Sequence, residues 1–229
     1  MGQWRQRWEA LLPLAIAAFL IVLALPRLVS SVIMLPVEPI MDALQAGRPV
    51  SDEDLQRFAS RSAAARRFSS AGRLATDLAA AKLAQAERLP TRAQSERREL
   101  VEDAAALLEE GLAATPANSF AWARLAYART VLEGPGAGAV DAWRMSVLTA
   151  PAETRLTVWR TRLGVALLAQ FREGDRDLLD RQIRFAWRSD PERLAAFAKS
   201  GGPETIQLIR IALLDEPGAL QKFDAALGG

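Results

Sequence analysis

One uncharged apolar run, ALLPLAIAAFLIVLALP at residues 10–26, constrains this chain more than any other feature. As a helix rising about 1.5 Å per residue, the run would cover about 25 Å, near the lower limit for crossing a bilayer. It lacks the polar stripe of a helix that packs against a soluble core, and the apolar stretch resumes after Arg27 as far as Leu35. We therefore expect residues 1–35 to form a short cytoplasmic N-terminus and a transmembrane anchor.

A cleaved signal peptide is the alternative interpretation of this run. It needs a small-x-small cleavage site after the apolar residues, and the following LPRLVSS contains no good one. Arg5 and Arg7 precede the run, whereas only Arg27 follows it before Arg48. The positive-inside rule then predicts a single-pass protein of the inner membrane, with its C-terminal part in the periplasm if the cell is a Gram-negative bacterium.

The composition predicts an all-α fold and excludes several function classes. The chain has no Cys and no His, which removes disulfides, the usual zinc and haem ligands, cysteine nucleophiles and Ser-His-Asp triads. Ala, Leu, Arg and Glu, all good helix formers, dominate the sequence. Without the three Arg and one Glu of residues 1–30, the remainder holds 26 basic and 26 acidic residues, so it lacks the net positive charge of a nucleic-acid-binding domain.

Residues 36–70 are predicted to be a juxtamembrane linker and a basic helix. Pro36 and Pro39 interrupt the chain after the anchor, and Ser51 with Asp54 forms a capping-box pattern that opens a helix over about 52–69. Five arginines then follow with no acid between them: Arg57, Arg61, Arg66, Arg67 and Arg73. A solvated helix face is the simpler interpretation, and contact with anionic lipid headgroups beside the anchor is the alternative.

One spacing recurs three times in the second half of the chain. An apolar residue is followed four positions on by a larger apolar residue, three further by a small residue, and five further by a proline. The three sets are Ala104, Leu108, Gly111, Pro116; Ala139, Trp143, Ser146, Pro151; and Leu179, Ile183, Ala186, Pro191. Such a recurrence is typical of a helical-repeat array.

These sets resemble the second helix of the tetratricopeptide repeat, and Trp122, Leu125 and Ala126 resemble the start of its first helix. Arg129 stands where that family has Tyr, and the next first helix, at Trp159, matches less well. The resemblance implies a TPR-like superhelix of helix pairs over residues 71–191. It also implies a groove lined by the first helices, to which it assigns five partner-binding residues: Phe120, Ala123, Tyr127, Thr161 and Val165.

After Pro191 the pattern changes, and residues 192–229 are predicted to be short capping helices at about 191–199, 204–214 and 217–227. An array of this kind needs such an end to cover its last apolar surface. No constellation of residues predicts a catalytic, metal or cofactor site. The adjacent acids at 102–103 and 109–110 read as solvated pairs, and the Gly-rich segment 134–138 lacks the Lys and Ser/Thr of a phosphate-binding loop.

We therefore expect a membrane-anchored adaptor or scaffold that holds protein partners in a bacterial envelope assembly. Cell-surface polysaccharide synthesis or export is the first pathway to consider. Two alternatives stay open: an envelope enzyme with an all-helical domain that acts on glycans, and a structural subunit of a larger membrane complex. Tetratricopeptide repeats that bind peptide carboxylates do so through a clamp of Lys and Asn side chains, and this sequence does not reproduce that clamp.

Overall fold

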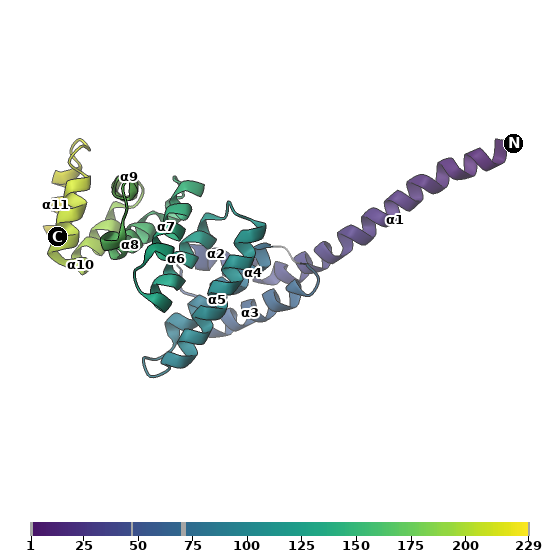
Figure 1. Cartoon of the computed structure of the whole chain (residues 1–229), viewed down its shortest axis with the longest axis horizontal. Helices are drawn as coiled ribbons and strands as arrows, with labels where there is room; N and C mark the ends of the chain where they lie inside the picture. The colour runs from purple at the N-terminus through teal and green to yellow at the C-terminus, as the bar shows by residue number, and fades with distance from the viewer. Residues whose placement is uncertain (1, 47, 70–71, 229) are drawn as a thin grey trace.

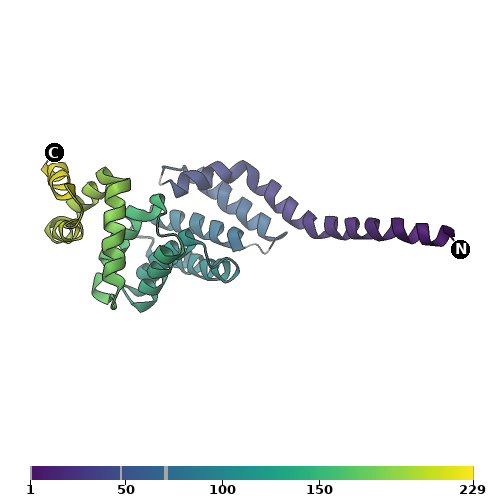
Figure 2. The same cartoon turned by 90° about the horizontal axis from the view of Figure 1, so that it is seen from above.

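The computed structural model describes residues 2–46, 48–69 and 72–228, with side chains from Pro13 onward. Every regular element in this part of the chain is a helix, as the composition predicts. The first helix, α1 (Gly2–Met34), leaves the molecule as a long rod, and the other helices stack side by side into an elongated body (Figures 1 and 2). The N-terminus lies at the free end of the rod and the C-terminus at the opposite end of the body.

α1 is long and apolar enough to cross a bilayer. Large apolar side chains along it are exposed, with Leu14 at 67% and Phe19 at 62% of full accessibility. Residues 13–28 are all exposed, so no other described part of the chain covers this stretch of the helix. The rod therefore has the length and surface expected of a membrane span.

The end of α1 is part of the folded body. Ser30 and Met34 are buried, and Met34 packs with Val37 and Phe58 in a small core beside the main one. These residues join α1 to η1 (Leu35–Val37), α2 (Glu38–Gln45) and α3 (Asp52–Arg66). The amide of Asp54 donates to Ser51 Oγ at 3.1 Å, so the predicted cap does open α3.

Three packed helix pairs follow. They are α4 (Gly72–Arg88) with α5 (Gln94–Ala114), α6 (Ser119–Glu133) with α7 (Ala137–Thr149), and α8 (Thr157–Leu167) with α9 (Asp175–Ser189). The second helix of each pair ends two residues before one of the three recurring prolines. Two 3₁₀ segments flank α8, η2 (Thr154–Leu156) before it and η3 (Leu168–Gln170) after it.

The small residue of the recurring spacing lets helices approach closely. A Cβ atom at Gly111 would lie 2.5 Å from Thr76 Cγ2 and 2.7 Å from the carbonyl oxygen of Gly72, so α4 and α5 meet almost backbone to backbone there. The large residue fills the space between pairs. Trp143 is fully buried and donates from Nε1 to the carbonyl of Arg160 at 2.9 Å.

The C-terminal end consists of α10 (Pro191–Ala212) and α11 (Ala219–Gly228). Asp190 caps α10 by accepting from the amide of Arg193 at 3.0 Å. The two helices predicted at 191–199 and 204–214 are the two arms of α10, which bends at Gly202, where φ is 78°. Phe223 of α11 is fully buried against the main core, so α11 covers the last apolar face of the array.

Candidate functional site

Helices α4 and α6 and the η2–α8 segment together line a cavity of about 420 Å³. Each presents residues spaced three, four and seven apart, which is one face of a helix. Since the three segments belong to successive pairs, the same face recurs along the array. The lining residues on these faces are Ala80, Leu83, Ala84 and Glu87; Phe120, Ala123, Arg124 and Tyr127; and Arg155, Val158, Trp159 and Arg162.

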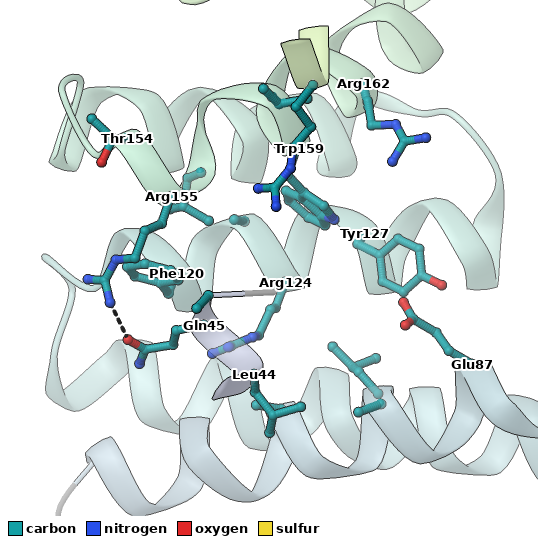
Figure 3. Close-up of a pocket in the computed structure, with 18 of the residues that line it drawn as sticks. Leu44, Gln45, Glu87, Phe120, Arg124, Tyr127, Thr154, Arg155, Trp159 and Arg162 are labelled. Atoms are coloured by element: carbon teal, nitrogen blue, oxygen red, sulfur yellow. Dashed lines mark hydrogen bonds between the residues drawn. The ribbon is translucent and has the colours of Figure 1, made fainter. Parts of the chain in front are cut away.

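Aromatic rings form the apolar wall of this pocket (Figure 3). The rings of Tyr127 and Trp159 meet edge to face, with their centroids 6.1 Å apart. The guanidinium carbon of Arg155 lies 4.9 Å from the centroid of the Phe120 ring, and that of Arg124 lies 5.9 Å from it. Cations held near aromatic rings in this way offer apolar surface and positive charge to the same ligand.

The charged groups of the pocket do not balance. Its lining includes four arginines and two acids: Arg124, Arg155, Arg162 and Arg193, with Glu87 and Asp190. Arg155 pairs with Glu153 at 3.0 Å and Arg193 with Asp190 at 3.6 Å. Within the described residues, Arg124 and Arg162 form no ion pair, so the pocket keeps two guanidinium charges without a carboxylate in contact.

The charge of Arg124 persists at neutral pH. Burial lowers the pKa of this guanidinium to about 10, and the negative charge of Asp77 opposes part of that shift. Asp77 is itself a buried residue of α4 outside the pocket lining. Burial raises the pKa of its carboxyl, against the opposing effect of Arg73, whose Nε lies 3.4 Å away. Arg124 therefore stays protonated over the physiological range.

Tyr127 is held in its neutral form. Burial, and next the nearby carboxylate of Glu87, raise the pKa of the phenol to about 12. Figure 3 shows the Glu87 carboxylate next to the Tyr127 hydroxyl, on one side of the pocket. The phenol therefore keeps its proton at any physiological pH, and the Glu87 carboxylate is its nearby acceptor.

The segment that follows α1 closes one end of the pocket. Leu44, Gln45 and Ala46, at the end of α2, belong to the lining. Gln45 Oε1 accepts a hydrogen bond from Arg155 Nη1 at 3.0 Å, drawn as the dashed line in Figure 3. Residues that follow α1 in the chain thus belong to the site.

The five residues predicted to bind a partner lie in two different environments. Phe120, Ala123 and Tyr127, on α6, line the pocket together. Thr161 and Val165, on α8, lie outside that lining: Thr161 is fully buried, and Val165 packs against the main core. The pocket-facing side of α8 is instead formed by residues that the sequence analysis did not select: Val158, Trp159 and Arg162.

Arg160 fixes which face of α8 is buried. Its side chain is fully buried and donates to Ser146 Oγ at 2.9 Å and to the carbonyl of Ala150 at 2.8 Å, at the end of α7. With Arg160 turned inward, the adjacent Trp159 faces the pocket and Thr161 does not.

Comparison with known proteins gives this chain no relative. No protein family, curated protein or solved structure matches it. The described residues also contain no group of three or more acids that could hold a metal ion. What the pocket can do is therefore inferred from its own geometry: it can bind a ligand that combines apolar and negatively charged groups.

Proposed function

We propose that this chain is a membrane-anchored adaptor whose TPR-like groove holds a segment of a partner protein at the membrane surface. The observation that carries the proposal is the recurrence of one pocket-facing helix face on α4, α6 and α8. A groove built from helix faces that recur along an array suits an extended or helical peptide.

The side chains that line the pocket indicate which kind of partner segment would bind there. Arg124 and Arg162 form no ion pair within the described part of the chain, and the aromatic wall stands between them. A partner segment with a carboxylate next to an apolar side chain would neutralise these charges and cover the rings. We therefore infer that the partner presents an acidic and apolar stretch.

The anchor determines the cellular compartment in which the chain would bind that partner. Ser30 and Met34 of α1 are buried against the body, which supports an anchor that stays attached rather than a signal peptide that is removed. Flanking charge favours a body outside the cytoplasm. We propose a partner in the cell envelope, with the machinery of cell-surface polysaccharide synthesis or export as the first assembly to examine.

Site-directed photo-crosslinking in native membranes tests this function. A photo-reactive amino acid replaces Thr154, an exposed residue at the pocket rim, or Ala117, an exposed residue outside the lining. We expect the probe at 154, and not the probe at 117, to capture one protein through an acidic segment. The charge reversal Arg162→Glu should abolish capture, because it repels that segment.

Arg92→Glu is the matched control, since Arg92 is exposed in the turn before α5 and outside the lining. Capture should survive this substitution. Equal capture at positions 154 and 117, or equal loss from both charge reversals, contradicts binding in the pocket. Cleavage of an envelope glycan by the purified chain, with no protein captured, would favour the enzyme alternative.

A further inference from the structure

The end of α3 lies beside the point where the anchor leaves the body. α3 packs antiparallel to the last turns of α1, and Ser62 Oγ contacts Met34 Sδ at 3.8 Å. The C-terminal end of α3 therefore points back toward the side from which the rod projects (Figures 1 and 2). Whatever surface the rod enters also lies in front of this end.

Most of the arginines in this region are engaged within the body. Arg57, Arg66 and Arg73 form ion pairs with carboxylates at 2.8, 2.6 and 3.4 Å. Arg61 and Arg67, by contrast, are exposed and have no ion pair among the residues described. The run of five arginines thus divides into three that stabilise the body and two whose charge is free for another partner.

Helix geometry gives the position of Arg67 along the rod relative to Arg27 of α1. Arg27 lies seven positions before Met34, and Arg67 lies five positions after Ser62. At about 1.5 Å per residue, Arg27 and Arg67 both lie roughly 8–10 Å closer to the N-terminal end of the rod than the contact between Met34 and Ser62 does. Arg67 is therefore level with Arg27, the first charge after the apolar run.

Arg27 marks one edge of a stretch that matches a bilayer. On α1, Arg7 and Arg27 are 20 positions apart in the sequence, which corresponds to about 30 Å of helix and to the thickness of the hydrocarbon core. With Arg27 at the lipid headgroups, Arg67 reaches the same layer. The next residue, Phe68, has 47% of its surface exposed, and an exposed aromatic at this level suits the interface between headgroups and acyl chains.

We propose that Arg27, Arg67 and Phe68 form a second membrane contact, which binds anionic phospholipid headgroups next to the span. This inference rests on the anchor of the proposed function but not on its pocket. Since α1 enters the body without a break, two attachments would hold the body at one tilt. They would also hold the pocket at a fixed height above the bilayer.

Fluorescence quenching of the full-length chain in lipid nanodiscs tests the contact. The chain has no native Cys, so Phe68→Cys carries a single apolar fluorophore in place of the ring. The discs contain phosphatidylcholine alone or with phosphatidylglycerol, plus a lipid spin-labelled near its headgroup. We expect stronger quenching in the anionic discs, weakened by added salt. Arg67→Gln should lower the ratio of docked to undocked bodies about fivefold.

Arg61→Gln is the matched control. Arg61 of α3 has the same charge as Arg67 and likewise no ion pair among the described residues, but it lies roughly 9 Å farther from the bilayer. We expect this substitution to leave the quenching unchanged. Suppose that the chain co-elutes with the discs and has therefore entered them. Equal quenching in the two kinds of disc, or an equal loss of quenching from both substitutions, then overturns the inference. If the chain fails to enter the discs at all, the anchor and the second contact both fall.

Discussion

Tyr127 gives a direct measurement of the pocket, because it is the only tyrosine of the chain. We expect tyrosinate absorbance of the folded protein to appear with a midpoint near pH 12, against about 10 for a free phenol. The folded-state pKa lies above the unfolded one. Tyr127 therefore contributes stability that is fully present below pH 10 and is lost as the pH rises through about 12.

Glu87→Gln should move the Tyr127 midpoint part of the way toward 10, since burial is the larger cause of the shift and remains. Glu133→Gln is the control, because Glu133 is an exposed residue outside the pocket, at the end of α6, the helix that carries Tyr127. A midpoint near 10 in the folded wild-type chain would show that the ring is not buried as described.

At the same scale, the sequence predicted part of the site. Phe120, Ala123 and Tyr127 line the pocket because α6 has the spacing on which they were chosen. Thr161 and Val165 lie outside this lining, because they were aligned on Leu163, in a helix that fits the repeat poorly. Pro116 and Pro151 are 35 residues apart, and adding 35 to the α6 face gives the lining of η2–α8. The spacing of the prolines therefore gives the register of η2–α8, which the match at Leu163 does not.

At the scale of helices, the contact of α4 with α5 depends on glycine. We expect Gly111→Ala to destabilise the protein by about 1–3 kcal/mol, because the new Cβ would lie 2.7 Å from the Gly72 backbone oxygen, which cannot rotate away. This cost exceeds the gain of about 1 kcal/mol in helix propensity. Thermal or denaturant unfolding of the detergent-solubilised chain measures the difference.

Gly138→Ala makes the same chemical change in α7 at an open position, where the nearest atom to a new Cβ is Arg129 Nη1 at 3.5 Å. We expect this variant to be neutral or more stable by up to about 1 kcal/mol. Comparing the two variants separates the cost of the close contact between α4 and α5 from the gain in helix propensity. Destabilisation of both variants, or of neither, would show that α4 and α5 do not meet at Gly111.

Helix ends were predictable where a single residue decides them. Ser51 and Asp190 cap α3 and α10 as their sequences indicate, and the recurring prolines follow α5, α7 and α9. The helices predicted at 191–199 and 204–214 are likewise the two arms of α10, which meet at Gly202, where the backbone leaves the helical conformation. The sequence did not predict that α2 closes the pocket, since Gln45 and Arg155 lie 110 positions apart and only tertiary packing joins them.

At the scale of the whole molecule, the orientation of the rod decides which partners the pocket can reach. The chain has no Cys, so Ala117→Cys places one thiol on an exposed turn of the body, and Gln3→Cys places one near the N-terminus. In intact bacterial cells we expect a membrane-impermeant maleimide to label position 117 at once, and position 3 only after the membrane is opened. The physical reason is the excess of Arg5 and Arg7 over Arg27 at the two ends of the apolar run.

The reverse labelling pattern would put the body in the cytoplasm. The partner would then belong to that compartment, and Arg67 and Phe68 would face the cytoplasmic leaflet. Labelling of both thiols in intact cells would mean that α1 does not span the bilayer. Because α1 runs from Gly2 to Met34 as one helix and its last turns are packed into the body, a thiol near its start and a thiol on the body together report its orientation. The result therefore places the pocket, the second membrane contact and the partner on the same side.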